Sequence, residues 1–394
     1  MKISSVETYT LGQPASAGGA TWAGTSIIVR VTTSNGLVGF GEAVPTLRVR
    51  PVVESIHEVE RVYLGKDPED VELNQHEWHK DDFYLPVSFE STTALSALDI
   101  ACWDIIGKAH DAPIHRLLGG SFRRRVRLYS NGWYSDCVTP EQFGTRAKKY
   151  ARMGYTALKF DPFGSYYDYI DRKGLDLAYE RVRAVRDSTG GKVELLIEHH
   201  GRFNPNSAIM IARRLAPLDP LFMEEPIHPD NVEGLRKYRA STSVRVALGE
   251  RILTKEQAAY VCSNHLTDFL QADITNIGGV TQAKKVCAIA EAYGVEMAFH
   301  NAFGPVQNAV TLQLDASIPN FLIQESFYDV FPDWKRKLIR GATKVERGHS
   351  EVPTKPGLGI EIDERVLEEY SFEGQEYFSP DEPVWVVKDT WKEP

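Results

Sequence analysis

The sequence is poor in cysteine and has no long apolar run, and each absence excludes a class of protein. Four cysteines are scattered over 394 residues without a Cys-x-x-Cys pair. We therefore expect reduced, buried thiols rather than a disulfide framework or a cysteine metal site. No apolar run approaches the roughly 18 residues that a membrane-spanning helix needs, and the first residues lack the apolar core of a secretory signal. These observations predict a cytoplasmic protein.

The sequence also lacks any excess of positive charge. Its formal net charge is −9, which disfavours nucleic acid as a partner, and it has no polybasic segment that would bind a membrane surface. The composition is otherwise that of a globular chain, with 42% hydrophobic and 25% charged residues. A chain of this length can form one large domain and a smaller one, each with its own core.

The first part of the chain does not alternate strands with helices. Two apolar stretches flank Asn35-Gly36, a sequence typical of the turn in a β-hairpin. Further on, residues 94–108 are apolar on nearly every side, which predicts a buried helix. A hairpin followed by helices indicates an α+β capping domain, which we place at residues 1–122.

From about residue 123, short apolar segments alternate with amphipathic, helical ones. Eight such segments match a (β/α)8-type barrel, a modified TIM barrel, better than an open doubly wound sheet. No glycine-rich phosphate loop follows the first of them, which disfavours a dinucleotide-binding fold. We place the barrel at residues 123–345 and expect the segment 346–394 to pack back on the capping domain. The predicted strands are residues 126–129, 157–160, 193–198, 221–224, 244–249, 269–273, 295–300 and 321–325.

Three glutamates, Glu198, Glu224 and Glu250, each follow a short apolar run and recur at equal intervals. The interval is that of one strand-plus-helix unit, so the three side chains should lie at the ends of consecutive parallel strands. Carboxylates that converge repel one another unless a cation lies between them. Because oxygen ligands suit a hard divalent ion, the sequence predicts a site for one Mg²⁺.

Ionisable residues stand at seven consecutive strand ends, where the active site of such a barrel lies. Each alone has an ordinary explanation, such as a helix cap, a surface ion pair or a buried histidine. Their concurrence favours a catalytic site instead. Alternation along a strand places His200 on the inward face of Glu198, whereas His199 and Glu225 point away. The seven residues are Lys159, Glu198, Glu224, Glu250, Asp273, His300 and Glu325.

Further motifs extend over nearly the whole chain. They are residues 98–108 with Pro113 and Leu117-Leu118-Gly119-Gly120, then Met223-Glu224-Glu225-Pro226, Leu248-Gly249-Glu250, Gln271-Ala272-Asp273 with Gly278-Gly279, and Pro356-Gly357-Leu358-Gly359. Together they resemble the enolase superfamily, in particular its mandelate-racemase-like subgroup. The resemblance implies that Glu198, Glu224 and Glu250 bind one Mg²⁺, which holds a substrate carboxylate and stabilises the enediolate formed when the α-proton leaves.

The same resemblance implies a base dyad of Asp273 and His300. The imidazole would accept the α-proton, and the carboxylate would fix its tautomer. Glu325 resembles the residue that hydrogen-bonds the substrate carboxylate, and we expect it to be protonated because it is buried near other anions. Lys159 would neutralise the substrate carboxylate or the surroundings of the metal.

One departure from the racemase pattern concerns the second barrel strand. Racemases of this subgroup carry Lys-x-Lys there, whereas this chain has Lys159-Phe160-Asp161, which leaves no second lysine for proton exchange on the opposite face. Three roles stay open for Asp161: binding a substrate hydroxyl, pairing with Lys159, or neither.

A second departure indicates dehydration. The run Glu198-His199-His200-Gly201-Arg202 resembles the Asp-x-His-Gly-Arg sequence of sugar-acid dehydratases, with Glu in place of Asp as the metal ligand. In those enzymes the histidine two residues after the ligand protonates the departing 3-hydroxyl, a role that would fall to His200. Hydroxide is a poor leaving group, so elimination needs such an acid.

The expected substrate is an aldonate, converted to a 2-keto-3-deoxy acid. D-gluconate comes first and D-galactonate second, on a resemblance to archaeal gluconate dehydratases. The alternatives are dehydration of D-xylonate or D-arabinonate, epimerisation or racemisation of an acid sugar, and a non-catalytic scaffold. Relatives are commonly symmetric, from dimers to octamers, and we expect a homo-oligomer. The predicted substrate-binding residues are Trp22, Thr46, Arg48 and Tyr84 in capping loops, with Asp161 and Arg202 in the barrel.

Overall fold

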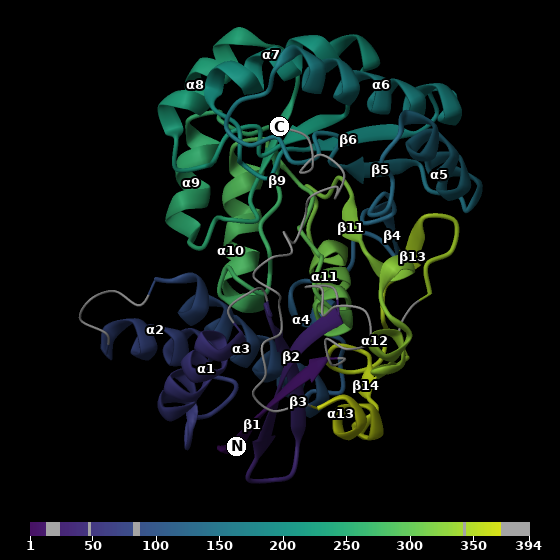
Figure 1. Ribbon diagram of the computed structural model, residues 1–394. Coiled ribbons are helices and arrows are strands. Elements are labelled where there is room, and N and C mark those ends of the chain that lie inside the picture. The colour runs from purple at the N-terminus through teal and green to yellow at the C-terminus, as the bar shows by residue number, and fades with distance from the viewer. Residues whose placement is uncertain (13–23, 46–48, 82–86, 342–343, 372–394) are drawn as a thin grey trace.

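The computed structural model describes residues 1–12, 24–45, 49–81, 87–341 and 344–371. Figure 1 shows a barrel of strands surrounded by helices, with a smaller group of strands and helices from the first part of the chain below it. This division agrees with the predicted architecture of a barrel and a capping domain.

The capping domain contains a three-stranded antiparallel sheet in the order β1 (Ile3–Gly12), β2 (Thr25–Thr33), β3 (Val38–Ala43). Gly36 turns the chain between β2 and β3 at φ +85°, and its backbone N–H donates to the carbonyl of Thr33 over 2.9 Å. A side chain is strained at such a φ, so the Asn-Gly pair suits the turn. The predicted hairpin is confirmed.

Helices α1 (Val49–Tyr63), α2 (Val71–Asp81) and α3 (Phe89–Ala109) complete this domain. Helix α3 is buried along nearly its whole length, as predicted. It lies so close to β3 that a Cβ at Gly39 would be 2.1 Å from the carbonyl oxygen of Ala101, and one at Gly41 1.9 Å from that of Ala97. The two glycines therefore allow the helix to pack directly on the strand.

Eight parallel strands form the barrel. In sheet order they run from β10 through β9, β8, β7, β6, β5 and β4 to β11, and a parallel bridge between Met297 and Phe321 joins the two ends. Each predicted strand segment overlaps an observed one, so the predicted fold is confirmed. The strands are β4 (Arg125–Ser130), β5 (Ala157–Phe160), β6 (Glu194–Glu198), β7 (Phe222–Glu224), β8 (Val246–Leu248), β9 (Phe269–Leu270), β10 (Glu296–Met297) and β11 (Gln324–Ser326).

Seven helices connect these strands in the described part of the chain. After β11 the chain enters α12 (Asp333–Lys337) instead of an eighth long helix and returns toward the capping domain. The connecting helices are α5 (Pro140–Arg152), α6 (Arg172–Thr189), α7 (Pro205–Leu215), α8 (Val232–Ser241), α9 (Lys255–Ser263), α10 (Gly279–Ala292) and α11 (Pro305–Ala316). A short helix, α4 (Ile114–Leu117), precedes the barrel.

Apolar side chains fill the barrel interior on the side of the strands' amino ends. Ala157, Leu196 and Phe222 belong to one buried cluster there. Two residues further along the same strands, toward their carboxyl ends, come Lys159, Glu198 and Glu224. Because side chains alternate along a strand, these charged groups point into the barrel above an apolar floor.

The C-terminal segment contacts both parts of the molecule. Strand β13 (His349–Glu351) pairs antiparallel with β4 of the barrel. Further on, the Leu358 N–H donates to Asp104 in α3 over 2.9 Å, and α13 (Glu364–Tyr370) is followed by a bridge between Ser371 and Leu11. Strand β12 (Ile339–Arg340) pairs with β14 (Glu361–Ile362). The exact domain boundaries stay a prediction.

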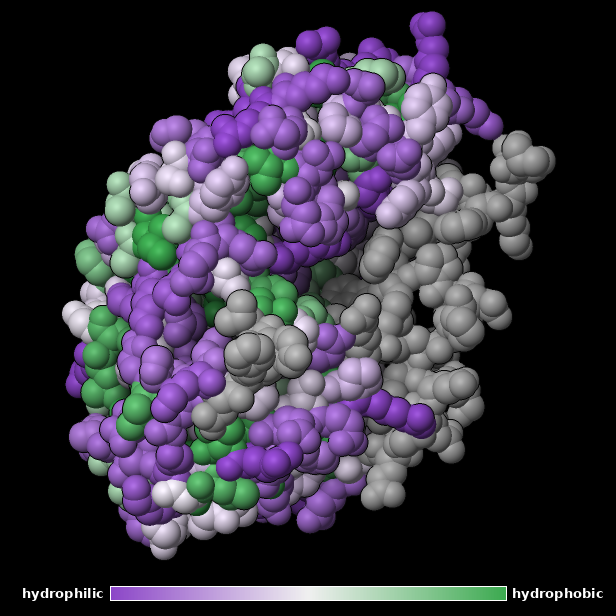
Figure 2. Space-filling model, turned by 90° about the vertical axis from the view of Figure 1, so that its left-hand side faces the viewer, coloured by the Kyte–Doolittle hydropathy of each residue, from purple (hydrophilic) through white to green (hydrophobic). Residues whose placement is uncertain are grey.

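The surface over α8, α9 and α2 is dominated by hydrophilic side chains, with apolar ones in small groups (Figure 2). The helices therefore bury their apolar faces against the sheet and one another. Among the described residues, no helix combines the length and apolarity needed to cross a membrane.

Candidate active site

Three carboxylates converge at the carboxyl ends of neighbouring strands. Glu198 ends β6 and Glu224 ends β7, and the two residues are direct partners in the parallel ladder. Glu250 follows β8 after Gly249, where a Cβ would lie 2.2 Å from the backbone of Gln271. One oxygen from each glutamate lies within 4.8 Å of the others. The expected convergence of the three side chains is therefore present.

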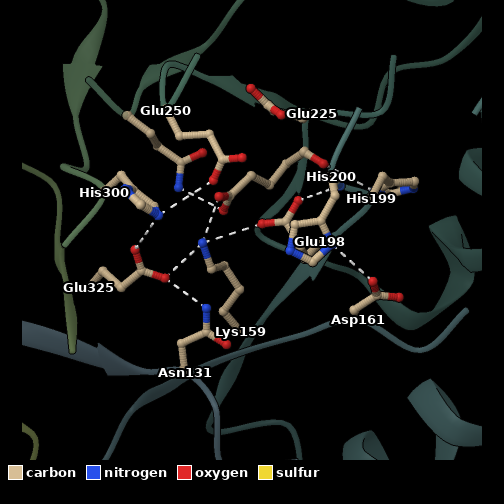
Figure 3. Close-up of polar contacts among 12 residues, drawn as sticks. Asn131, Lys159, Asp161, Glu198, His199, His200, Glu225, Glu250, His300 and Glu325 are labelled. Atoms are coloured by element: carbon tan, nitrogen blue, oxygen red, sulfur yellow. Dashed lines mark hydrogen bonds and ion pairs between the residues drawn. The ribbon is translucent and has the colours of Figure 1, made fainter. Parts of the chain in front are cut away.

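Lys159 lies at the centre of these carboxylates (Figure 3). Its Nζ is 2.6 Å from Glu224 Oε1, 2.8 Å from Glu325 Oε1 and 3.4 Å from Glu198 Oε2, and its side chain is 1% exposed. Burial alone would lower the pKa of Lys159, but the surrounding carboxylates, Glu224 first, raise it well above its ordinary value. Lys159 is therefore a permanent cation at this position.

The carboxylates differ in how easily they ionise. Burial and the neighbouring Glu198 raise the pKa of Glu224 well above its ordinary value. Burial also raises the pKa of Glu250. Burial would do the same to Glu198, but His200 and Lys159 outweigh it and lower its pKa. A divalent cation among the three oxygens would relieve this crowding, and an all-oxygen donor set fits Mg²⁺.

Glu325 is held as a carboxylate, which corrects the expectation that it is protonated. Asn131 Nδ2 donates to its Oε1 over 2.7 Å, and the Asn301 N–H donates to its Oε2 over 2.9 Å. Burial raises the pKa of Glu325, but the ammonium of Lys159 and the imidazole of His300 outweigh burial and lower it. The prediction counted the neighbouring anions and missed the cation between them.

His300 and Asp273 form the expected dyad. Nδ1 of His300 lies 2.6 Å from Asp273 Oδ2, and its Nε2 lies 3.4 Å from Glu250 Oε2. Thr275 donates to Asp273 Oδ1 through its N–H over 2.7 Å and its hydroxyl over 2.6 Å, and Gln307 Nε2 donates to both oxygens over 2.9 Å. Asp273 therefore fixes the proton on Nδ1 and directs Nε2 toward the carboxylates.

The charges around His300 favour its protonated form. Burial would lower the pKa of this imidazole, but Glu325 and Asp273 outweigh burial and raise it to about 9. A cation bound among the carboxylates would oppose this effect, because it would offset the negative charge that Nε2 faces.

His200 is held by a buried ion pair on the other side of the site. Its Nδ1 lies 3.0 Å from Asp161 Oδ2, and Arg202 binds both oxygens of Asp161 over 2.6 and 2.9 Å. The His200 N–H donates to Glu198 Oε1 over 2.6 Å. Burial would raise the pKa of Asp161, but Arg202 and His200 outweigh it and hold it at about 2. Asp161 is thus an anion between the guanidinium of Arg202 and the imidazole of His200.

The ion pair between Asp161 and Arg202 bears on the roles predicted for these two residues. The observed partners of Asp161 are Arg202 and His200. Pairing with Lys159 was one of the three roles left open, and the ion pairs of the described residues do not include it. The side chains of Asp161 and Arg202 are 2% and 4% exposed. Their binding of substrate stays a prediction, and the observed contacts support a role in orienting His200.

His199 and Glu225 point away from Lys159, as alternation predicts (Figure 3). The ring of His199 packs 4.7 Å from that of Phe163. Glu225 is fully buried and forms an ion pair with Arg251, which also lies 3.0 Å from Glu250 Oε1. Trp22, Thr46, Arg48 and Tyr84, the predicted capping-loop contacts, lie outside the described residues.

Several polar residues of the site were not assigned from the sequence. Gln271 Nε2 donates to Glu224 Oε2 over 2.7 Å, and Arg251 pairs with Glu250. Asn131 and Gln307 hold Glu325 and Asp273 through their side-chain amides, and Asn301 holds Glu325 through its backbone N–H. Their one sequence signal is position, because each follows a barrel strand within a few residues or begins the next helix.

Comparisons with known proteins agree with this geometry. Residues 142–366 match the family described as enolase C-terminal domain-like, and residues 8–119 match the N-terminal domain of mandelate racemase / muconate lactonizing enzyme. A mandelate racemase/muconate lactonizing enzyme from Jannaschia sp. CCS1 superposes with a TM-score of 0.88 at 33% identity, covering 95% of this chain and 99% of that one.

Two curated relatives are closer in sequence. A D-gluconate dehydratase from Thermoproteus tenax is 50% identical over 373 residues, which are 95% of this chain and 75% of that protein. A D-gluconate/D-galactonate dehydratase from Picrophilus torridus is 48% identical over 390 residues, 99% of both proteins. The chain therefore belongs to the mandelate racemase/muconate lactonizing enzyme family of the enolase superfamily.

Proposed function

We propose that the protein is a Mg²⁺-dependent hydro-lyase that removes water from an aldonate, D-gluconate first, to give a 2-keto-3-deoxy acid. The observation that carries this proposal is the pair of histidines on opposite sides of the carboxylate cluster (Figure 3). His300 lies against Asp273 and His200 lies against Asp161. Dehydration needs a base for the C2 proton and a separate acid for the 3-hydroxyl, and two independently held imidazoles supply both.

Glu198, Glu224 and Glu250 would hold the Mg²⁺. When bound, the ion would hold the substrate carboxylate, stabilise the negative charge that develops on it, and offset the charges that raise the pKa of His300. Gln271 and Lys159 donate to Glu224, and Arg251 pairs with Glu250. These contacts orient the carboxylates toward one common point.

The protein's own residues would carry the two proton transfers. His300 Nε2 takes the proton from C2, and the electron pair of that bond moves toward the substrate carboxylate. The return of this pair forms the C2–C3 double bond and breaks the C3–O bond. The 3-hydroxyl leaves as water with a proton from His200, and the enol that remains rearranges to the 2-keto-3-deoxy acid. Lys159 would bind the substrate carboxylate, and the ionised Glu325 would hold the ammonium of Lys159 in place.

The surroundings of Asp161 favour dehydration over racemisation. A racemase needs a second base on the opposite face of C2. At the position where racemases carry the second lysine, this chain has a carboxylate that Arg202 and His200 hold as an anion with a pKa of about 2. Such a weak base would not remove a C2 proton. The names of the two curated relatives support gluconate, with galactonate next.

The test is incubation with Mg²⁺ and a library of aldonic and aldaric acids, followed by an assay for 2-keto-3-deoxy products. We expect product from D-gluconate and a smaller amount from D-galactonate. Exchange of the C2 hydrogen without loss of water would instead assign an epimerase, and absence of metal-dependent turnover would leave a non-catalytic barrel.

A homo-oligomer, from a dimer to an octamer, stays a prediction that light scattering would check.

A further inference from the structure

Two barrel helices begin without a side-chain cap of their own. Each of α5 to α9 begins after a Thr, Asp or Asn whose side chain accepts a hydrogen bond from the first turn. Helices α10 and α11 instead follow Gly278 and Gly304, which have no side chain to do this. An uncapped helix start leaves backbone N–H groups without partners. These two helices follow the strands that lead to Asp273 and His300.

Carboxylates of the capping domain supply the missing caps. Glu42, at the end of β3, accepts from the N–H groups of Val306 and Gln307 in the first turn of α11 over 3.0 and 2.9 Å. Asp99, in α3, accepts from the N–H of Thr281 in the first turn of α10 over 3.1 Å. These are the donors that an N-cap residue of the same helix would serve, and a carboxylate suits the positive end of the helix dipole.

Gly304, before α11, and Gly279, the first residue of α10, make room for these carboxylates. A Cβ at Gly304 would lie 1.7 Å from Glu42 Oε1, and a Cβ at Gly279 would lie 2.3 Å from Asp99 Oδ2. Glu42 is fully buried, and the positive charge of Lys335, which is also fully buried, compensates the negative charge of Glu42. The ammonium of Lys335 donates to the carbonyl oxygen of Thr25 over 2.8 Å. The contact is therefore a close fit between two domains, and at Gly304 it leaves no space for a capping side chain.

A residue in the first turn of α11 also contacts the base dyad. Gln307, whose N–H binds Glu42, donates through its side chain to both oxygens of Asp273 and accepts from the Phe303 N–H over 2.8 Å. A second connection runs through α3, where the Thr93 hydroxyl donates over 2.7 Å to the carbonyl of Thr275. Thr275 in turn donates to Asp273 Oδ1.

We propose that docking of the capping domain positions the base dyad, with Glu42 and Gln307 as the positioning residues. This inference rests on the proposed dehydration. Glu42 holds the first turn of α11, that turn holds the amide of Gln307, and the amide holds the carboxylate plane of Asp273 against Nδ1 of His300. Displacement of a catalytic group by about 1 Å costs on the order of 10²-fold in rate, so the dyad depends on this distant support.

The experiment compares Gln307→Leu with Gln313→Leu in the full-length protein. Gln313 is also a fully buried glutamine of α11, and its amide donates over 2.9 Å to the Pro353 carbonyl, away from the dyad. We expect Gln307→Leu to lower kcat on gluconate by about 10- to 100-fold with KM within about threefold, and to raise the isotope effect on kcat for substrate deuterated at C2. Gln313→Leu should change neither kcat nor the isotope effect.

Glu42→Gln tests the domain contact with little change of shape. Its control is Asp104→Asn, since Asp104 is likewise a buried carboxylate that accepts from two backbone N–H groups, those of Phe40 and Leu358, and pairs with a lysine. We expect a loss of about 3- to 10-fold in kcat for Glu42→Gln, with KM unchanged, and no such loss for Asp104→Asn.

A readout without substrate separates this inference from the proposed function. In the wild type, the Nδ1 proton of His300 should give a downfield NMR signal, assigned by its loss in His300→Asn. We expect that signal to shift or disappear in Gln307→Leu and to stay in Gln313→Leu. An unchanged signal, or equal kcat losses in the two variants, would overturn the positioning role. A wild type that dehydrates no aldonate but shows the expected signals would refute the proposed reaction alone.

Discussion

Replacing Asp161 with Asn tests the buried ion pair that holds His200. The change keeps the shape of the side chain but removes its charge. It therefore leaves the guanidinium of Arg202, which is 4% exposed, without the carboxylate that it binds with two hydrogen bonds. A buried charge that loses its partner is strongly destabilising, because it keeps its desolvation cost without the compensating attraction.

The magnitude follows from the pKa of Asp161. Folding lowers it from the ordinary 3.8 to about 2, a difference that corresponds to about 2 kcal/mol of stability at pH 7. Removal of one partner from a buried pair typically costs roughly 3–5 kcal/mol. We therefore expect Asp161→Asn to lower the free energy of unfolding by about 2–5 kcal/mol at pH 7.

The pH dependence has a definite sign. Because the pKa in the folded state is depressed, the stabilisation is complete above the unfolded value of 3.8 and is lost as pH falls through about 2. At pH 3 about half of the linked stabilisation should remain, so the difference between wild type and Asp161→Asn should shrink by about 1 kcal/mol.

The assay is urea unfolding of four proteins at pH 7 and pH 3: the wild type, Asp161→Asn, Arg202→Met and the double variant. The double variant should recover stability relative to Asp161→Asn, since it leaves no unpaired charge. Asp176→Asn is the control, because Asp176 pairs with Arg214 at the surface, where both side chains are about half exposed, and should change stability by less than about 0.5 kcal/mol. A loss for Asp161→Asn no larger than that of the control would refute this reasoning.

Three further predictions concern the reaction. Glu224→Gln should abolish Mg²⁺ binding in calorimetry and turnover while the barrel stays folded, and full Mg²⁺ affinity would contradict its role as a ligand. His200→Asn should lose about 10²–10⁴-fold in the rate of dehydration yet still exchange the C2 hydrogen in deuterated water. His300→Asn should show neither dehydration nor exchange. Near-normal dehydration by His200→Asn would leave the acid unassigned. Mg²⁺ at 100 times its Kd should stabilise the wild type by roughly 2.7 kcal/mol in a thermal melt, an increase that EDTA reverses and Glu224→Gln lacks.

The barrel and the metal carboxylates were readable from the sequence because their signals are local. A short apolar segment that ends in Glu198 or Glu224 predicts a strand, the residues that face inward and the charge at its end, all from a few neighbouring residues. The regular strand-helix alternation then brings such ends together without knowledge of any distant contact. The same locality explains the hairpin at Gly36, where one dipeptide determines the turn.

The protonation of Glu325 and the partners of Asp161 depend instead on long-range contacts. The pKa of Glu325 is set by the ammonium of Lys159, which is distant in sequence and is shared among three carboxylates. Asp161 is bound by Arg202 across a neighbouring strand and loop. Sequence alternation shows which side chains point into the barrel, but it does not show which of them pair there, because pairing is decided by distances of a few ångströms.

The starts of α10 and α11 lie between these two cases. Gly278 and Gly304 stand where five neighbouring helices carry a Thr, Asp or Asn, and this local gap can be read from the sequence once the helices are located. A helix start that lacks its own cap and is buried must obtain acceptors from elsewhere. Both gaps follow the strands that lead to the base dyad. Glu42 and Asp99 fill them from the capping domain, so the dyad reaches its observed geometry only when both domains are in contact.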